Sequence, residues 1–205
     1  MDHDPYQGEK SMKTNIAILL IVAIATYATT LYLSEDSVKP TVNDVPDRSA
    51  INEPVQNAEK IPEFTFTDIK GKTRNIRDLE GKIIVLNFWA SWCAPCVKEF
   101  PNLLTIAENN RDNVVLLALS SDFNENDITK FITKMKNMDG FENLSFDAPN
   151  IHLALDKDQA ITAKKFSTFK LPETLIIDQN QNLRHKLIGA DWNEKDLQSI
   201  IESLQ

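Results

Sequence analysis

Apolar and polar residues follow two different patterns along most of this chain. Continuous apolar runs rich in β-branched residues are typical of strands covered on both faces, whereas apolar residues three or four positions apart indicate amphipathic helices. The first pattern predicts strands over residues 82–90, 114–120, 151–156 and 173–178, and residues 183–189 are predicted to form a hairpin with the last of these across the turn "QNQN". The second pattern predicts helices over residues 96–109, 124–138, 157–166 and 193–204.

The order of these elements favours one fold class. Ahead of them, "FTFTDIKGKTRNI" alternates in polarity and predicts a short hairpin that turns at Lys70 and Gly71. Strands that alternate with helices favour a central sheet with parallel members and helices on both faces, and the last two strands add an antiparallel end. The sequence therefore predicts an α/β fold with a central mixed sheet.

The N-terminal part of the chain has a different character. Residues 15–33 contain no charged side chain, and as a helix they would span about 28 Å, close to the ~30 Å of a bilayer core. Tyr27 and Tyr32 suit the membrane interface at one end. We expect a transmembrane anchor. A cleaved signal peptide remains the alternative, because "AIA" precedes Thr26, although the apolar run continues beyond that point.

The remaining segments complete the predicted domain organisation. Residues 1–14 read as a cytoplasmic extension, with Met12 as an alternative start, and residues 34–60 read as a polar, proline-containing tether. The folded domain is predicted over residues 61–205. A large domain after one N-terminal span is usually translocated, so we expect this domain outside the cytoplasm.

Composition narrows the classes of function. The formal net charge of −8 argues against a nucleic-acid-binding protein, which would present a basic face. The two cysteines are too few for the disulfide framework of a small secreted scaffold. Attention therefore turns to what these two thiols could do as a pair.

Both cysteines lie in "SWCAPC", between a predicted strand and a predicted helix. Cys93 falls at the start of the helix, where unpaired N–H groups and the helix dipole favour a thiolate. Cys96 lies one turn further along, within reach of a disulfide, and Pro95 occupies the first turn, where a missing N–H is tolerated. This placement favours a redox pair in which Cys93 attacks and Cys96 resolves the mixed disulfide.

Two neighbours of the pair are candidates for supporting roles. Glu99 lies three residues after Cys96 on the same helix face and could accept its proton, although a solvated helix residue is an equally good interpretation. Trp92 is expected to cover the Cys93 sulfur and to offer an apolar platform to a partner.

Other uses of a cysteine pair fit the sequence less well. A structural disulfide that closes so small a loop restrains little of the unfolded chain. A zinc site would need two further ligands, and the three histidines are scattered at His3, His152 and His185. We therefore expect no metal and no cofactor apart from a redox-active disulfide between Cys93 and Cys96.

The motif "FWASWCAPC" resembles the active site of the thioredoxin superfamily. In addition, "WCAPCVKEFP" followed by "LPETLIID" is similar to the membrane-anchored branch typified by TlpA, ResA and CcmG. The resemblance covers the chain from about Ile61 to the C-terminus. It implies a thioredoxin fold with a central insertion, which matches the extra material over residues 124–150, and an extracytoplasmic location behind an N-terminal anchor.

The resemblance also implies roles for individual residues. Glu99 matches the acidic residue of the branch's C-x-x-C-x-x-E pattern, and Asn87 replaces the buried aspartate of ordinary thioredoxins, which leaves Glu99 as the one obvious proton acceptor. Pro172 matches the superfamily's cis-proline beside the disulfide. Leu171 would offer backbone hydrogen bonds to a substrate strand there, and Glu173 matches an acid that CcmG-like members carry.

These implications lead to an expected function. We expect a membrane-tethered thiol–disulfide oxidoreductase of the bacterial inner membrane, facing the periplasm and reducing disulfides of client proteins. The family suggests apocytochrome c or copper-site assembly proteins of cytochrome oxidase as clients, and a membrane thiol transporter of the DsbD or CcdA kind as electron donor. A disulfide oxidase or isomerase, and a non-catalytic thioredoxin-fold module that binds a metal or a partner, remain alternatives.

Overall fold

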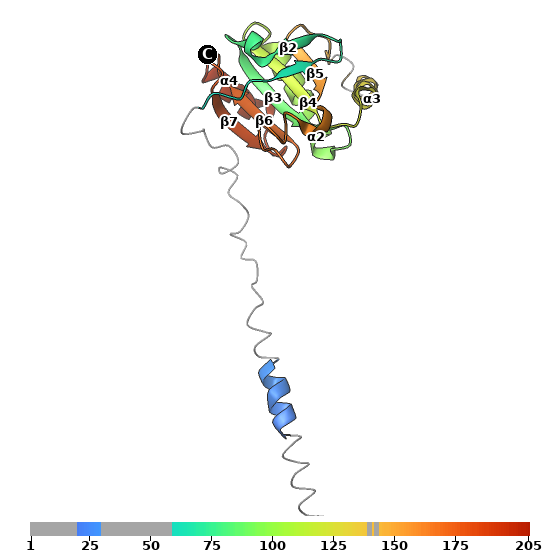
Figure 1. Cartoon of the computed structure of the whole chain (residues 1–205), viewed down its shortest axis with the longest axis vertical. Helices are drawn as coiled ribbons and strands as arrows, with labels where there is room; N and C mark the ends of the chain where they lie inside the picture. Colours follow the sequence, from blue (N-terminus) through green and yellow to red (C-terminus); the bar gives the residue numbers. More distant parts are fainter. Residues whose placement is uncertain (1–19, 30–58, 139–140, 142–143) are drawn as a thin grey trace, which may run out of the picture. The chain divides into compact units, whose positions relative to one another are not determined.

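The computed structural model describes residues 20–29, 59–138, 141 and 144–205, in two compact units divided after Pro46. The first unit shows a helix over residues 20–29 (Figure 1). Most of the predicted extension, tether and anchor lies outside the described residues, including residues 1–19 and 30–58. Within the described ranges, no helix combines the length and apolarity needed to cross a bilayer.

The second unit is built on a five-stranded sheet with the order β5-β4-β3-β6-β7 (Figure 1). Strands β3, β4 and β5 are parallel, and β6 pairs antiparallel with both β3 and β7. The parallel members and the antiparallel end confirm the predicted mixed sheet. The strands are β3 Ile83–Trp89, β4 Val114–Ser120, β5 Ile151–Leu155, β6 Glu173–Ile177 and β7 Leu183–Ile188.

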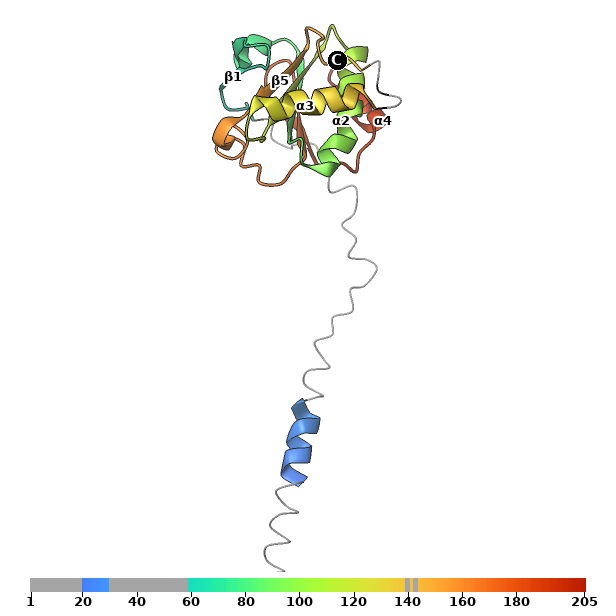
Figure 2. The same ribbon diagram turned by 90° about the vertical axis from the view of Figure 1, so that its right-hand side faces the viewer.

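One face of the sheet carries all three α-helices of this described unit. Side chains alternate between the faces of a strand, and every residue of β3 and β4 is buried, so the apolar residues divide into two core clusters. The first cluster joins the sheet to the helices, which lie together in Figure 2 with α3 across the front. They are α2 Ala94–Asn109, α3 Glu125–Lys136 and α4 Glu194–Glu202.

The other face is covered without an α-helix in the described residues. Its cluster joins the sheet to the N-terminal hairpin, to the 3-10 helix η3 (Ile76–Leu79) and to residues Ile161 and Phe166. The hairpin strands β1 (Thr65–Thr67) and β2 (Thr73–Asn75) flank a turn in which Gly71 has a φ of 79°, which confirms the predicted hairpin.

The prediction of a helix over residues 157–166 is wrong. The chain forms a short 3-10 helix, η4 (Lys157–Gln159), and then turns. Asp158 and Gln159 have left-handed backbone angles, with φ of 57° and 50°, which an α-helix does not accommodate. The expectation of helices on both faces was therefore also wrong, because this segment was to supply one of them.

The segment predicted as an insertion, residues 124–150, contains α3 and the stretch that leads to β5. The sheet, the helices and their order otherwise follow the predicted α/β arrangement. The result places the end of β3, the start of α2 and the start of β6 at the same edge of the molecule, where the cysteine pair lies.

Candidate redox-active site

The two cysteines occupy the junction between β3 and α2. Cys93 is the N-cap residue of α2, with an extended backbone, and its sulfur accepts a hydrogen bond from the backbone N–H of Cys96 at 3.3 Å. The two sulfurs form a disulfide with an S–S distance of 2.09 Å and a Cα–Cα distance of 5.3 Å. The predicted position of Cys93 at the helix start is confirmed, and that position favours negative charge on its sulfur.

A buried carboxylate holds the loop that delivers Cys93. Asp122, just after β4, accepts hydrogen bonds from the backbone N–H of Ser91 at 3.1 Å and from its hydroxyl at 2.8 Å. The Ser120 hydroxyl donates a third bond at 2.6 Å. Because this network joins neighbouring strands, it orients the stretch immediately before Trp92 and Cys93.

The two sulfurs differ in their access to solvent. The Cys93 residue is 7% exposed and lines an open hollow of about 430 Å³, whereas Cys96 is 0% exposed. The exposed side chain of Trp92, at 63%, stands beside the same hollow. A partner can therefore reach Cys93 first, and Cys96 can react only with a group already attached to Cys93. The other lining residues are Pro95, Ser121, Gln159, Thr162, Thr168, Phe169, Lys170 and Leu171.

The loop before β6 borders the disulfide, as the resemblance implies. The Leu171–Pro172 peptide bond is cis. Leu171 and Pro95 line both the first hollow and a second one of about 480 Å³, which Pro172 also borders. The charged side chains that line the second hollow are two lysines and one aspartate: Lys98, Lys170 and Asp191.

Glu173 lies apart from both hollows. Its carboxylate is buried, accepts a hydrogen bond from the Thr168 hydroxyl at 2.8 Å and forms an ion pair with Lys186 at 2.8 Å. These contacts tie the start of β6 to β7 and to the preceding loop. The structure therefore places Glu173 one residue from the cis-proline but outside the surface that a partner could touch.

Glu99 is a residue of α2, and its side chain is buried in the protein interior. It is 2% exposed, and its Oε1 accepts a hydrogen bond at 2.8 Å from the side-chain amide of Asn87. The same amide donates to the Thr174 hydroxyl at 2.9 Å. Burial raises the pKa of Glu99 to about 8, and the Asn87 hydrogen bond opposes part of that rise. The interpretation of Glu99 as a solvated helix residue is wrong.

Sequence reasoning missed several residues around the site. Asn87 was noted as unable to take a proton, but its role as a donor to Glu99 was not foreseen. No chemical role was predicted for the segment over residues 189–192, although the Trp192 side chain is among the groups that oppose the rise in the Glu99 pKa. Phe169 and Lys170 were also missed, and their position directly before Leu171 was the available signal.

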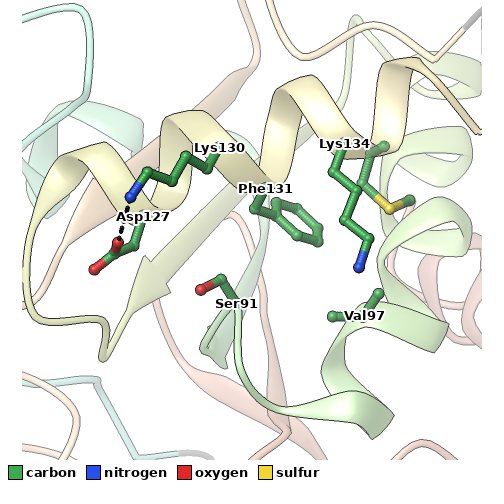
Figure 3. Close-up of a pocket in the computed structure, with 7 residues that line it drawn as sticks. Ser91, Val97, Asp127, Lys130, Phe131 and Lys134 are labelled. Carbon is green, nitrogen blue, oxygen red and sulfur yellow. Dashed lines mark ion pairs between the residues drawn. The ribbon is translucent and has the colours of Figure 1, made fainter.

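A further hollow of about 200 Å³ lies between α3 and the stretch around the motif (Figure 3). The ring of Phe131 points into it, and Lys134 reaches toward Val97, while Lys130 is paired with Asp127 at 3.7 Å. Ser91 and Met135 complete the lining. Neither cysteine lines this hollow, so it takes no direct part in chemistry at the disulfide.

A metal centre finds no support in the described part of the chain, where no group of three or more His, Cys, Asp or Glu side chains could hold an ion. His152 is instead buried beside Asp68, and His185 lies on β7. What the geometry provides is a disulfide with one reachable sulfur, one buried sulfur and a buried acid nearby. Those features define the class of thiol–disulfide oxidoreductases.

Comparisons with known proteins agree with this class. The model of the AhpC/TSA family matches residues 58–186. The thiol–disulfide oxidoreductase ResA of Bacillus anthracis is 32% identical over 147 residues, which cover 71% of this chain and 78% of that protein. ResA of Geobacillus kaustophilus is 25% identical over 196 residues, which cover 95% of each chain.

Solved structures show the same fold. A DsbF homologue from Corynebacterium diphtheriae matches with a TM-score of 0.59 and 19% identity, over 75% of this chain and 93% of that one. The exposed lipoprotein thioredoxin Etrx1 from Streptococcus pneumoniae matches with a TM-score of 0.54 and 22% identity, over 70% and 100%. The fold is therefore thioredoxin-like. The chain belongs to the AhpC/TSA family and is a thiol–disulfide oxidoreductase.

Proposed function

We propose that this protein is a reductase of disulfides in client proteins, with the Cys93–Cys96 pair as its only redox centre. One observation carries the proposal: the reachable sulfur lies at the start of α2, while the buried sulfur lies on the same helix as a buried acid of raised pKa. This arrangement supports two successive thiol–disulfide exchanges, each with a defined attacker.

The first exchange begins with the reduced enzyme. The Cys93 thiolate attacks one sulfur of the client disulfide, a mixed disulfide forms, and the other client sulfur leaves as a thiolate. The helix start stabilises the attacking anion. Trp92, Pro95 and Leu171 border the hollow in front of Cys93 and would hold the client chain there, with the backbone of Leu171 bonding to it.

The second exchange releases the client. Cys96 transfers its thiol proton to the Glu99 carboxylate and attacks the Cys93 sulfur, so the mixed disulfide breaks and the client leaves with both cysteines reduced. The enzyme becomes the disulfide. A pKa of about 8 makes the Glu99 carboxylate a much stronger base than an ordinary carboxylate, and therefore a better acceptor for the thiol proton.

The cellular setting belongs to the same proposal. The uncharged run over residues 15–33 supports a membrane tether that leaves residues 61–205 on the periplasmic side of the inner membrane. A membrane thiol transporter of the DsbD or CcdA kind would return two electrons to the disulfide. Clients would be apocytochrome c or copper-site assembly proteins, whose cysteines must stay free in an oxidising compartment.

The first prediction separates the two cysteines. In the full-length chain, Cys93→Ser should abolish the reduction of a protein disulfide, because it removes the attacking sulfur. Cys96→Ser should instead accumulate a mixed disulfide with the substrate, since the resolving thiol is lost. Mass spectrometry under non-reducing conditions measures the adduct, and Ser203→Ala serves as an exposed control.

The direction of the reaction, reduction or oxidation of the client, is tested on the same protein. We expect equilibration with glutathione or dithiothreitol to give a reduction potential nearer to the ~−270 mV of thioredoxin than to the ~−120 mV of a strong oxidant. A value near the oxidant end, or purified protein that reduces no disulfide, would overturn the proposed reductase. In cells that lack this protein, haem attachment to c-type cytochromes should be lost. Its recovery with the wild-type chain, and not with Cys93→Ser, would support the proposed clients.

A further inference from the structure

Phe169 is an exposed aromatic side chain that the core of the protein does not use. It is 83% exposed and belongs to neither core cluster. Three residues earlier, Phe166 packs against Phe64 and Phe88, with ring centroids at 5.8 and 5.3 Å. Single exposed apolar side chains are common, so exposure alone indicates no function. What sets Phe169 apart is its place in the loop before the cis-proline, where it lines the hollow in front of Cys93.

A second exposed aromatic side chain lines the same hollow. Trp92 is 63% exposed and directly precedes Cys93, so it reaches the hollow from the loop before α2, whereas Phe169 reaches it from the loop before β6. Neither ring takes part in the aromatic pairs found within the described residues. Both rings can therefore contact a further group that enters the hollow. We refer to Trp92 and Phe169 as the aromatic clamp.

The chemistry at Cys93 decides what enters this hollow. In the first exchange a client disulfide must touch the Cys93 sulfur, and the residues on either side of the client cysteine enter with it. The volume of about 430 Å³ lies within the ~300–1,000 Å³ range of pockets that bind small molecules, so a large side chain has room. An apolar side chain between the two rings would remove apolar surface of all three groups from water.

Charge in the hollow argues against a basic side chain at this place. Among the described residues that line it, Lys170 is the charged one besides the Cys93 thiolate, and no carboxylate is present to pair with a lysine or an arginine. Ser121, Gln159 and Thr162 supply neutral polar groups. The exposed apolar surface of the hollow is thus the feature that a client side chain can use.

We propose that Phe169 is a specificity-determining residue, which together with Trp92 selects clients that carry an aromatic or large aliphatic side chain next to the reacting cysteine. The inference rests on the proposed function, because it names the class of clients for the same site. Phe169 contacts the client chain and not the reacting sulfurs. Its removal therefore changes which disulfides are attacked and leaves the exchange at Cys93 itself unchanged.

A set of peptide disulfides tests the inference on the full-length chain. Each probe is the symmetric disulfide of Ac-Ala-X-Cys-Ala-amide or Ac-Ala-Cys-X-Ala-amide, in which X is Phe, Ala or Lys. The reduced Cys96→Ser protein is mixed with each probe, so that Cys93 forms a disulfide with one peptide copy and the other copy leaves as a thiolate. Mass spectrometry of acid-quenched samples measures the rate at which the adduct forms.

We expect the Phe probe to react about tenfold faster than the Ala probe on at least one side of the cysteine, the size expected for burial of a large apolar side chain. Adding Phe169→Ala should reduce this preference to about twofold, whereas Phe169→Leu should retain most of it because an apolar wall remains. The Lys probe should react no faster than the Ala probe. Hydroxyethyl disulfide, which has no side chain to place in the hollow, should react equally with all variants.

Phe123→Ala is the matched control. Phe123 is 91% exposed but does not line the hollow in front of Cys93, so its removal should leave the preference for the Phe probe unchanged. An undiminished preference in Phe169→Ala, an equal loss in Phe123→Ala, or a Lys probe as fast as the Phe probe would overturn the inference. So would a Phe169→Ala variant that changed only the oligomeric state of the chain, because the ring would then serve contacts between copies.

Failure of the proposed function gives a different result. If the wild-type protein equilibrates with glutathione at the potential of a strong oxidant, the proposed reductase is lost. The adducts of the Cys96→Ser protein would still report the preference of the aromatic clamp, because they form by attack of Cys93 alone.

Discussion

At the scale of single residues, Glu99 shows how burial changes the acidity of a side chain. A carboxyl three residues beyond the second cysteine has a normal acidity in water. Removal from water disfavours the charged form, and the Asn87 amide restores only part of the lost stabilisation, so the pKa rises to about 8. The native disulfide form therefore holds this proton more tightly than the unfolded chain does.

The second prediction follows from that difference. Because the native pKa lies above the unfolded value of about 4.5, stability is complete below pH 4.5 and is lost as pH rises through 8. The loss is roughly 4 kcal/mol, at ~1.4 kcal/mol for each pH unit. Glu99→Gln should abolish this dependence, as measured by urea unfolding of the disulfide form.

Glu108→Gln is the control on the same helix, because Glu108 is partly exposed and paired with Arg111. It should keep the wild-type dependence on pH. A constant difference in free energy of unfolding between Glu99→Gln and the wild type at pH 5 and pH 8.5 would contradict the raised pKa.

At the scale of elements, the segment after β5 departs most from its sequence pattern. Apolar spacing favours a helix over residues 157–166. The buried carboxylate of Asp156, however, accepts hydrogen bonds from backbone N–H groups that a helix would use. Asp156 accepts the backbone N–H of Ile161 at 2.9 Å and that of Thr162 at 2.6 Å. Such side-chain bonds compete with helix formation, and here they fold the segment against the sheet. Gln159, Thr162 and Thr168 then line the hollow in front of Cys93.

The third prediction concerns this carboxylate. Asp156→Ala leaves two buried N–H groups without their acceptor, so we expect the free energy of unfolding to fall by about 2–4 kcal/mol. Disulfide reduction should also slow, because the hollow loses its defined wall. Urea unfolding and a reduction assay measure both effects.

Lys164→Ala, at an exposed position of the same segment, should leave stability within about 0.5 kcal/mol of the wild type. If Asp156→Ala behaved like this control, the carboxylate would have no part in holding the segment.

At the scale of the whole molecule, two buried groups oppose each other in the dependence of stability on pH. Burial, followed by the nearby Arg74, lowers the pKa of His152 to about 4, against the opposing influence of Asp68 at 3.7 Å. The unfolded chain thus binds a proton more readily than the native protein. His152 therefore contributes stability that is present above pH 6.5 and is lost as pH falls through 4.

The fourth prediction combines the two groups. Between pH 4.5 and 6.5 their slopes are equal in size and opposite in sign, so the stability of the wild type should be nearly flat there. Glu99→Gln should reveal the rise due to His152, about 2–3 kcal/mol from pH 4 to 6.5, and His152→Gln should reveal the fall due to Glu99. A flat curve in both variants would contradict this account.

Local pattern was sufficient to predict much of this molecule. The buried runs predicted the strands, and the junction of strand and helix predicted Cys93 at the helix start, because periodicity and capping depend on neighbours in the sequence. The resemblance of the cysteine motif and of "LPETLIID" implied that Pro172 lies beside the disulfide. The turns after β5 were not predicted, because the Asp156 carboxylate accepts hydrogen bonds from backbone N–H groups that would otherwise bond within a helix.

Tertiary structure alone decided which side chains lose contact with water and which of them meet. Glu99 became a group of raised pKa only because α2 packs it against the sheet, where Asn87 from β3 and Trp192 from beyond β7 approach it. These residues are separated by 12 and 93 positions (Glu99 − Asn87 and Trp192 − Glu99). Desolvation and hydrogen bonding depend on distance in space, which a one-dimensional pattern does not contain.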